Sequence, residues 1–520
     1  MPIVQQGSIN TTALVVPDLY VQIVPPQNLV LNGVPTNVLG IVGTASWGPV
    51  GQPVIAATMS DYARNFGPVM ARKHDMGTQM ATAVQQGAQN FRLVRVTDGS
   101  DVAAQTTLPG TTVVFTARHT GSMGNRIALA LTAGARANSW RLTITMPGLA
   151  PEVFDNLAGV GNDFWSALAD AVNSGQGPRR GSSQFVTADD GGAILSPSPI
   201  ALSLGSDIAG SDGAIFVATA QLVGGDTAPR QGMYALRGQG CSLALLADAD
   251  DPAFWTTQAE FGLEEGAYMI LTTPAGDSIS NAVATKQSMG LDSHAAKLMF
   301  GDWLWWQDQV NSSLRLVSPQ GFVAGRLANL SPEQSSLNKP LYGVIGSQKS
   351  GTPGSGQTTS YAAAELAVLL GAGIDVIANP QPAGAFWGVR GGHNASTNTA
   401  INGDNYTRLT NYIAATLAAG MGQYVGQLIS ADLFRRIRAT QMAFLQAMLS
   451  QGLLGSSDGS LPFSVICDNS NNPPTRTGLG YVQSDAQVQY QAINEKFIVN
   501  MEGGQTVQVA RQTLPSGQVF

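Results

Sequence analysis

Short apolar runs alternate with a helical pattern between residues 29 and 96. Residues 38–43 (Val-Leu-Gly-Ile-Val-Gly) form one such run, and residues 91–96 form another. Residues 75–90, between the two runs, are a helix candidate. A strand, a helix and a second strand in this order are typical of parallel sheets, so the stretch predicts part of an α/β domain.

The same order of elements returns between residues 205 and 384. Uninterrupted apolar runs at 242–247 and 267–271 predict parallel strands that are buried on both faces. A helix over 361–370 and a strand over 374–378 are predicted next. This second stretch is therefore also predicted to be α/β.

Between these stretches, in residues 100–204, apolar and polar positions alternate with the two-residue period of a strand. Residues 111–117, 127–132 and 140–146 alternate apolar and polar positions and are separated by turns rich in Gly and Asn. We therefore predict a β-rich domain over 100–204, inserted into one discontinuous α/β domain that consists of residues 25–99 and 205–384.

The last part of the chain, residues 385–520, is predicted to be a separate α+β domain. Its clearest element is a helix that begins after Ser430 and ends near Ser450, with Ser430 as a suitable N-cap. Its apolar face contains Phe434, Ile437, Gln441, Phe444, Leu445 and Met448. The best cationic cluster of the chain, Arg435, Arg436 and Arg438, lies on the same helix. A solvated helix face and a surface for an acidic partner both stay open for these arginines.

Both ends of the chain contain strand-like sequence. Residues 13–24 are β-branched, interrupted by Pro17, and residues 487–499 and 506–509 have the same character around a turn at 501–504. A terminal strand needs a partner for its backbone groups, either in its own domain or in a neighbour. We therefore expect subunit-linking arms, with these residues as candidates: Leu14, Val15, Val16, Tyr20, Val21, Ile23, Val488, Tyr490, Phe497, Val499, Val507 and Val509.

The composition favours a protein that covers its surface with copies of itself. Charged residues make up 12% of the chain, about half the usual share. Burying neutral polar groups costs less than burying charges, so such a surface suits an assembly.

The net charge of −7 and the lack of a basic tract argue against a nucleic-acid partner. No stretch of about 18 apolar residues predicts a membrane span, and no secretion signal begins the sequence. Cys241 and Cys467 are expected to be free, buried thiols.

Candidate catalytic and metal chemistry is weak. A subtilisin-type protease needs Asp, His and Ser in that order, but the four histidines (His74, His119, His294, His393) have no suitable serine motif. The nearest, Gly-Ser-Met-Gly at 121–124, lies in the β-rich insertion. Asp248, Asp250 and Asp251 could bind a hard cation, but a solvated turn is favoured. No cofactor and no catalytic activity are expected.

Four segments resemble one family. The segment 316–326 (Leu-Val-Ser-Pro-Gln-Gly-Phe-Val-Ala-Gly-Arg) is followed at 328–340 by a stretch that ends in Lys-Pro. Together they resemble the signature region of contractile bacteriophage tail sheath proteins. Residues 117–127 resemble the turn that opens the inserted β domain of that family, and 406–413 resemble the helix that opens its C-terminal domain. The sequence departs from some branches at 422–427.

The resemblance implies a fold and a role. Such proteins have a non-catalytic, subtilisin-like α/β domain, an outward-facing inserted domain, and a C-terminal domain that faces a tube. Their arms, here residues 1–24 and the C-terminal end of 385–520, exchange strands between subunits of stacked hexameric rings. The implied partners are further copies, the tail tube protein, and baseplate and tail terminator proteins, in a virion assembled in the bacterial cytoplasm. Arg435, Arg436 and Arg438 become tube-facing candidates. A phage tail and a phage-derived bacteriocin both stay open, as does another capsid or baseplate component.

Overall fold

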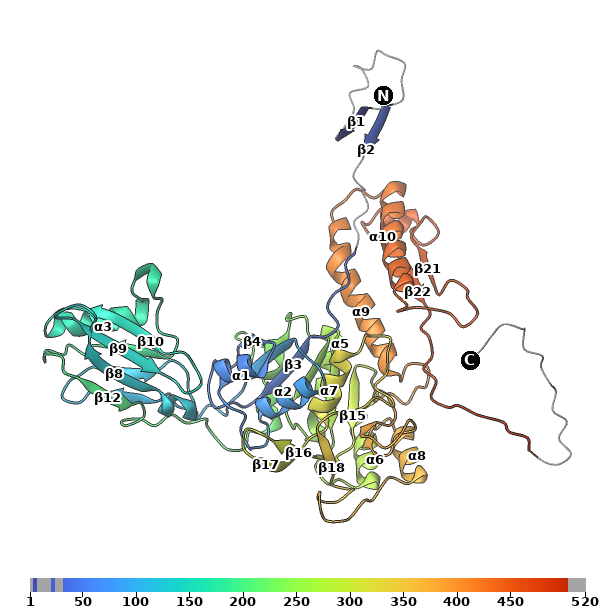
Figure 1. Ribbon diagram of the computed structural model, residues 1–520. Helices are drawn as coiled ribbons and strands as arrows, with labels where there is room; N and C mark the ends of the chain where they lie inside the picture. The colour runs from blue at the N-terminus through green and yellow to red at the C-terminus, as the bar shows by residue number, and fades with distance from the viewer. Residues whose placement is uncertain (1–2, 7–19, 24–30, 504–520) are drawn as a thin grey trace.

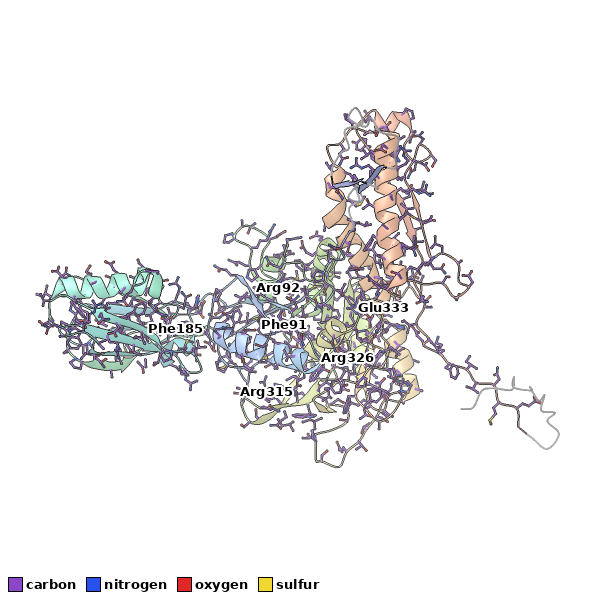
Figure 2. The ribbon with its side chains drawn as sticks, turned by 45° about the horizontal axis from the view of Figure 1, so that its top comes forward. Phe91, Arg92, Phe185, Arg315, Arg326 and Glu333 are labelled. Atoms are coloured by element: carbon purple, nitrogen blue, oxygen red, sulfur yellow. The ribbon has the colours of Figure 1, made fainter. Side chains whose placement is uncertain are left out.

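The computed structural model describes residues 3–6, 20–23 and 31–503. Figure 1 shows three units: a central α/β body, a β-rich lobe beside it, and a pair of long helices that rises from the other end of the body. A second view keeps the same separation, with Phe185 in the lobe and Phe91 in the body (Figure 2).

The body is built on a six-stranded sheet. Its strand order is β15-β14-β13-β3-β5-β4, and all neighbours are parallel except β4, which is antiparallel to β5. Strands β3, β13, β14 and β15 are buried along their whole length, as expected for apolar runs covered on both faces. The bounds are β3 Leu39–Gly43, β4 Pro53–Ala56, β5 Phe91–Arg95, β13 Leu243–Leu246, β14 Tyr268–Thr272 and β15 Ala296–Met299.

Helices cover both faces of this sheet, because neighbouring residues of a strand point to opposite sides. Leu243 and Leu245 pack with α1, α2 and α7, whereas Ala244 and Leu246 pack with α4, α5, α6 and α8. The bounds are α1 Met59–Phe66, α2 Met76–Gln85, α4 Thr219–Val223, α5 Trp255–Glu265, α6 Ile279–Ser288, α7 Gln320–Asn329 and α8 Ala363–Gly371. A small sheet at the edge is formed by β16 Leu304–Asp308, β17 Ser313–Val317 and β18 Val344–Ser347.

The strand predicted over 374–378 is shorter in the structure. Only β19 (Ile377–Ala378) forms, paired with β20 (Gly388–Val389), while Asp375 makes a single parallel bridge to Met299. Val389 and Ala395 pack in the cores of the body. The α/β packing therefore continues past residue 384.

The lobe has its own core between two antiparallel sheets and α3 (Asn162–Ser174). The first sheet consists of β11, β7 and β6, and the second of β10, β9, β8 and β12. Phe115, Ile144, Phe154 and Trp165 are buried in this core. The bounds are β6 Gln105–Thr107, β7 Val114–Ala117, β8 Ala128–Ala133, β9 Trp140–Thr145, β10 Glu152–Leu157, β11 Val186–Asp189 and β12 Ile200–Ser203.

The C-terminal unit is a helical hairpin with a small sheet. Helix α9 (Asp404–Met421) is followed by α10 (Ala431–Ser450), whose N-cap Ser430 accepts a hydrogen bond from Leu433 N, as predicted. All six residues predicted for the apolar face of α10 are buried. Strands β21 (Phe463–Ile466) and β22 (Asp485–Val488) pair antiparallel, with α11 (Pro474–Thr477) between them.

Short 3-10 turns and one isolated strand pair complete the described elements. The turns are η2 Ser122–Arg126, η3 Gly177–Arg179, η4 Gly232–Leu236, η5 Pro252–Phe254 and η6 Gly422–Tyr424. Near the N-terminus, β1 (Ile3–Gln6) pairs in parallel with β2 (Tyr20–Ile23).

Candidate assembly surfaces

The N-terminal end of the described chain runs along α9. Arg408 Nη2 donates to Thr36 O at 3.4 Å, and Val34 N donates to Thr416 Oγ1 at 3.3 Å. Leu31 then packs against Gly420, near the C-terminal end of the helix. The chain is therefore led toward the far end of the helical hairpin, and Figure 1 shows the β1–β2 pair beyond that end.

The β1–β2 pair is an incomplete sheet. Its register joins Ile3 to Tyr20 and Gln6 to Ile23. In the described residues the pair has no third strand, and a two-stranded sheet alone is marginally stable in water. The candidates Tyr20, Val21 and Ile23 lie on β2. The candidates Leu14, Val15 and Val16 lie outside the described residues.

The β21–β22 pair is also a two-stranded sheet in the described part of the chain. Phe463 and Val465 are buried, whereas Ser464 and Ile466 are exposed, so one face of β21 packs on the hairpin core and the other meets solvent. The candidate Val488 lies on β22 and packs at the rim of the same core. Such a pair has backbone groups at its edges that can receive further strands.

After β22 the chain is fastened first to the C-terminal unit and then to the body. Gln489 N donates to Pro462 O at 2.7 Å, and the Tyr490 ring meets the Tyr406 ring edge-on at 5.9 Å between centroids. Asn405 Nδ2 donates to Gln491 O at 3.0 Å. The last contact pairs His393 Nε2 with Glu495 Oε1 at 2.8 Å.

Beyond Glu495 the chain leaves the body, and we call residues 496–503 the C-terminal arm (Figure 1). Phe497, Ile498, Val499 and Met501 in this arm are exposed, by 70% to 88%. The prediction of a strand over 487–499 is therefore wrong beyond Val488 for the single chain. A strand needs a neighbouring strand for its backbone groups, and residues 489–499 have none in the described part of the chain. The candidates Val507 and Val509 lie outside the described residues.

The three arginines predicted on α10 are exposed. Arg435 Nη2 lies 3.2 Å from Asp432 Oδ1, an exposed pair one turn away, and the Arg436 guanidinium lies over the Tyr424 ring at 5.7 Å. The buried side of α10 faces away from them. Arg435, Arg436 and Arg438 therefore form a solvent-facing cationic strip, which fits either alternative left open by the sequence.

A buried ion cluster joins α9 to the sheet of the body. Lys297 Nζ on β15 lies 2.6 Å from Asp375 Oδ2 and 3.0 Å from Asp404 Oδ1, and Asp404 is the first residue of α9. Burial alone would raise the pKa of Asp404, but Lys297 and hydrogen bonds from Ser336 and Tyr268 hold it at about 2. Because Lys297 is shared by the two carboxylates, which also accept from Ser336 Oγ, Gly391 N and Gly392 N, the cluster fixes where the helical hairpin starts.

A second buried cation joins the lobe to the body. Arg95 on β5 is fully buried and donates to Ala45 O at 3.0 Å, Gly48 O at 2.7 Å and Thr120 O at 2.8 Å. Arg72 in the body pairs at 2.8 Å with Asp212, which in turn accepts from Ser122 N of the lobe at 2.6 Å. The lobe is therefore tied to the body by several bonds rather than by a bare linker.

The histidines are not arranged as in a serine protease. His74 Nδ1 lies 2.7 Å from the Ala247 carbonyl, and burial lowers its pKa. His119 packs edge-on to Trp47, and burial, with the charges of Arg118 and Arg95, lowers its pKa to about 4. Among the described residues, no serine hydroxyl is hydrogen-bonded to a histidine ring, the contact that activates such a nucleophile. The geometry gives the protease alternative no support.

Two smaller predictions are also resolved. The solvated turn predicted at Asp248 is wrong, because its side chain is buried and accepts from Gln79 Nε2 at 2.8 Å. Asp250 pairs instead with Lys73, and Asp251 caps η5.

Cys241 and Cys467 are buried and free, as predicted. Over the described ranges no group of three metal-ligating side chains occurs, and no helix is long and apolar enough to cross a membrane.

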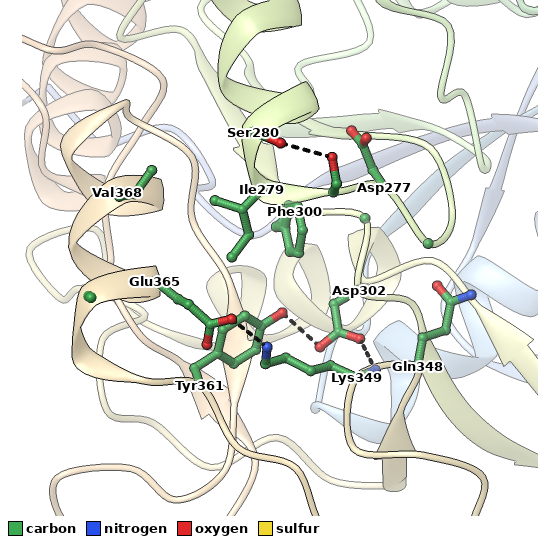
Figure 3. A pocket seen from close by; sticks show the side chains of 14 residues that line it. Asp277, Ile279, Ser280, Phe300, Asp302, Gln348, Lys349, Tyr361, Glu365 and Val368 are labelled. Carbon is green, nitrogen blue, oxygen red and sulfur yellow. Dashed lines mark hydrogen bonds and ion pairs between the residues drawn. The ribbon is translucent and has the colours of Figure 1, made fainter.

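A cavity of about 790 Å³ lies at the carboxyl ends of β14 and β15, where α/β sheets commonly bind ligands. Figure 3 shows that Asp302, Tyr361, Lys349 and Glu365 in its wall bind one another. Asp302 accepts from Lys349 N at 2.8 Å and from Tyr361 Oη at 2.9 Å, while Lys349 Nζ pairs with Glu365 at 2.8 Å. Lys349, Glu365 and Asp302 therefore already have partners, and the carboxylate of Asp277 in the wall accepts from Asn281 Nδ2 at 2.7 Å.

The fold of this chain is similar to the solved structures of two sheath tail proteins. The sheath tail protein of Listeria innocua matches with a TM-score of 0.60 and 15% identity, over 85% of this chain and 90% of that one. That of Desulfitobacterium hafniense matches with a TM-score of 0.57 and 16% identity, over 86% and 93%.

A contracted sheath of another kind has the same fold. The sheath of an extracellular contractile injection system, PVC, matches with a TM-score of 0.54 and 12% identity, over 95% of this chain and 99% of that one. No protein-family model matches the sequence, and no curated protein is similar enough to count as a relative. The predicted sheath fold is therefore confirmed by structure rather than by sequence.

Some features of these surfaces are not in the sequence prediction. The pairing of His393 with Glu495, 102 residues away, and the exposed Ile498 and Met501 were not among the candidates. The apolar run around Phe497 could have indicated the exposed residues. No local pattern indicates the histidine contact, because it depends on how the chain returns across the body.

Proposed function

We propose that this chain is the structural subunit of a contractile sheath, and that it is not an enzyme. The observation that carries the proposal is the match of its fold to contractile sheaths over most of both chains. The low share of charged residues and the incomplete two-stranded sheets at both ends support a chain that completes itself by assembly.

In this proposal the body is a non-catalytic, subtilisin-like α/β domain, and the sheath consists of stacked hexameric rings around a tail tube. The N-terminal arm and the C-terminal arm add strands to the sheets of neighbouring copies, with β21–β22 as the receiving pair. Each main-chain hydrogen bond is worth about 0.5–1.5 kcal/mol net and hardly depends on side-chain identity. A mesh of such strands can stay connected while the bodies rotate against one another.

The proposed partners follow from the same assembly. They are further copies of the chain, the tube protein, and baseplate and terminator proteins at the two ends. A chain of the anti-feeding prophage baseplate has a similar fold, with a TM-score of 0.51. The proposed location is the tail of a virion or a related injection particle assembled in the bacterial cytoplasm.

The test is electron microscopy of the purified recombinant chain at high concentration, alone and with the cognate tube. Hollow striated cylinders of uniform width support the proposal. Dispersed particles in both samples contradict it. A second sample lacks residues 1–22: we expect a folded chain that does not polymerise, and normal cylinders from this truncation contradict the strand exchange.

A further inference from the structure

Helix α8 is apolar on almost every side and yet lies on the surface. Its sequence is Ala-Ala-Glu-Leu-Ala-Val-Leu-Leu-Gly, with Glu365 as its only charged residue. Of its residues only Leu369 is fully buried, and Val368 is 50% exposed. Ala363, Ala364 and Ala367 are exposed as well. A helix that is apolar all round is normally covered, so this one lacks a cover in the single chain.

Two hollows flank this helix. The cavity of Figure 3 lies on one side and takes Ala364 and Val368 into its wall. A second hollow, of about 850 Å³, lies on the other side and takes Leu366 and Leu370. Glu365 pairs with Lys349, so the helix presents no unpaired charge among the described residues. An apolar cover therefore fits the helix itself, whereas the wall of the second hollow also carries charged side chains such as Lys339 and Arg390.

The second hollow is bounded on its far side by residues 493–497 of the same chain. The chain is fastened there at Glu495 and then leaves as the C-terminal arm, with Phe497 and Ile498 exposed directly after the last contact. Residues 493–497 therefore line the same hollow as Leu366 and Leu370 of α8, together with Lys339 and Arg390 of the body. A copy that takes up the start of this arm stands next to α8.

We propose that α8 is an interface helix, buried in the assembled sheath against the copy that receives the C-terminal arm. The inference rests on the proposed sheath function and adds to it a second contact between the same two copies. The arm supplies the backbone link, and α8 supplies apolar area between the two bodies. Apolar area of this kind strengthens an assembly without demanding matched charges.

The test compares two single substitutions at exposed valines, Val368→Glu on α8 and Val310→Glu in the turn between β16 and β17, where Val310 is 60% exposed. The full chain is polymerised at a series of concentrations and pelleted. We expect V368E to raise the critical concentration at least about tenfold, the effect of losing about 1.4 kcal/mol per added subunit. We expect V310E to behave as the unsubstituted chain.

Thermal unfolding of the unpolymerised chains accompanies the pelleting. Because both side chains are exposed, we expect the melting temperatures of both variants to match that of the unsubstituted chain. Equal critical concentrations for all three chains overturn the role of α8 and leave the sheath proposal standing. If the unsubstituted chain forms no polymer even with its tube, the sheath proposal fails and this inference falls with it.

Discussion

At the scale of single residues, the buried ion cluster is the most sensitive point of the molecule. Among the described residues, Lys297 is the one cation within hydrogen-bond distance of Asp375 and Asp404, and all three side chains are buried. Replacing one member of a buried cluster leaves uncompensated charge, which typically costs about 3–5 kcal/mol. We therefore expect Lys297→Met to lower the free energy of unfolding by about that amount in urea titrations.

The matched control for this substitution is Lys73→Met. Lys73 pairs with Asp250 at 2.9 Å but is 35% exposed, so solvent screens the pair and the expected loss is at most about 1 kcal/mol. Similar losses for the two variants would contradict a special role of the buried cluster. A larger loss for Lys297→Met supports it as the joint that holds α9 to the sheet.

Asp75, the N-cap of α2, gives a pH signature that the ion cluster does not. Its burial raises its pKa to about 7, despite hydrogen bonds from Thr78 and the charge of Arg72. Its Oδ1 has no hydrogen-bond partner among the described residues, which fits a carboxyl group that is protonated in the fold. The folded state thus binds this proton more tightly than the unfolded state, and the stability from this group is lost as pH rises from about 4 to about 7.

Asp75→Asn tests this assignment, because an amide keeps the capping oxygen and cannot ionise. We expect the free energy of unfolding of the variant, relative to the original chain, to increase between pH 4 and pH 7 and then to level off. The measurement is urea unfolding across that range. A constant difference at all pH values would mean that the carboxyl of Asp75 does not titrate there.

At the scale of elements, the clearest local determinant is the cap of α10. Ser430 Oγ accepts from Leu433 N at 3.2 Å and satisfies one of the free amides of the first turn. We expect Ser430→Ala to lower the free energy of unfolding by about 1 kcal/mol. Ser450→Ala, at the exposed end of the same helix, is the control and should change it by less than about 0.5 kcal/mol. Equal effects would contradict the cap.

How far the sequence predicts these elements depends on where their partners lie. Helix α10 has its cap, its apolar face and its end within one stretch, and it is predicted closely. Strands β3, β13 and β14 are predicted because burial on both faces leaves continuous apolar runs. The strand expected over residues 489–499 does not form, because no segment within residues 3–6, 20–23 and 31–503 pairs with it.

Contacts between segments that are distant in the sequence cannot be predicted from local sequence patterns. Lys297 meets Asp375 and Asp404 across 78 and 107 residues, so no spacing in the sequence links the three. Helix α8 illustrates the reverse case. Its apolar pattern predicts the helix, and the usual inference from such a pattern is burial in the body, but the structure leaves most of it on the surface.

At the scale of the whole molecule, buried polar contacts hold the three units together, whereas the described parts of the two arms lack such contacts. Arg95 and the Arg72–Asp212 pair tie the lobe to the body, and the buried ion cluster ties the helical hairpin to it. The arms, by contrast, have incomplete sheets or exposed apolar residues. This division gives a rigid subunit with adaptable ends, which suits a lattice that changes its packing while its links persist.

Substitution of the exposed arginines of α10 is expected to affect tube binding and not self-assembly. If Arg435, Arg436 and Arg438 face an acidic tube, as the resemblance to sheath proteins implies, their charge acts between sheath and tube and not between sheath subunits. We therefore expect the triple substitution to Gln to leave polymerisation of the chain alone unchanged. Co-sedimentation of the same variant with the cognate tube should fall at low ionic strength.

Measuring tube binding at several salt concentrations distinguishes a loss of electrostatic attraction from a change in the shape of the binding surface. Near 1 M salt the screening length is about 3 Å, so the original chain and the triple variant should bind the tube equally weakly there. A triple substitution to Gln of Arg118, Arg136 and Arg141 is the control, because it removes the same charge from residues 100–204, the β-rich lobe, which Figure 1 shows away from α10. If both triple variants lose tube binding equally, net charge alone explains the effect and the α10 strip has no special position. If only the α10 variant loses it, and only at low salt, these arginines set the register of the sheath on its tube.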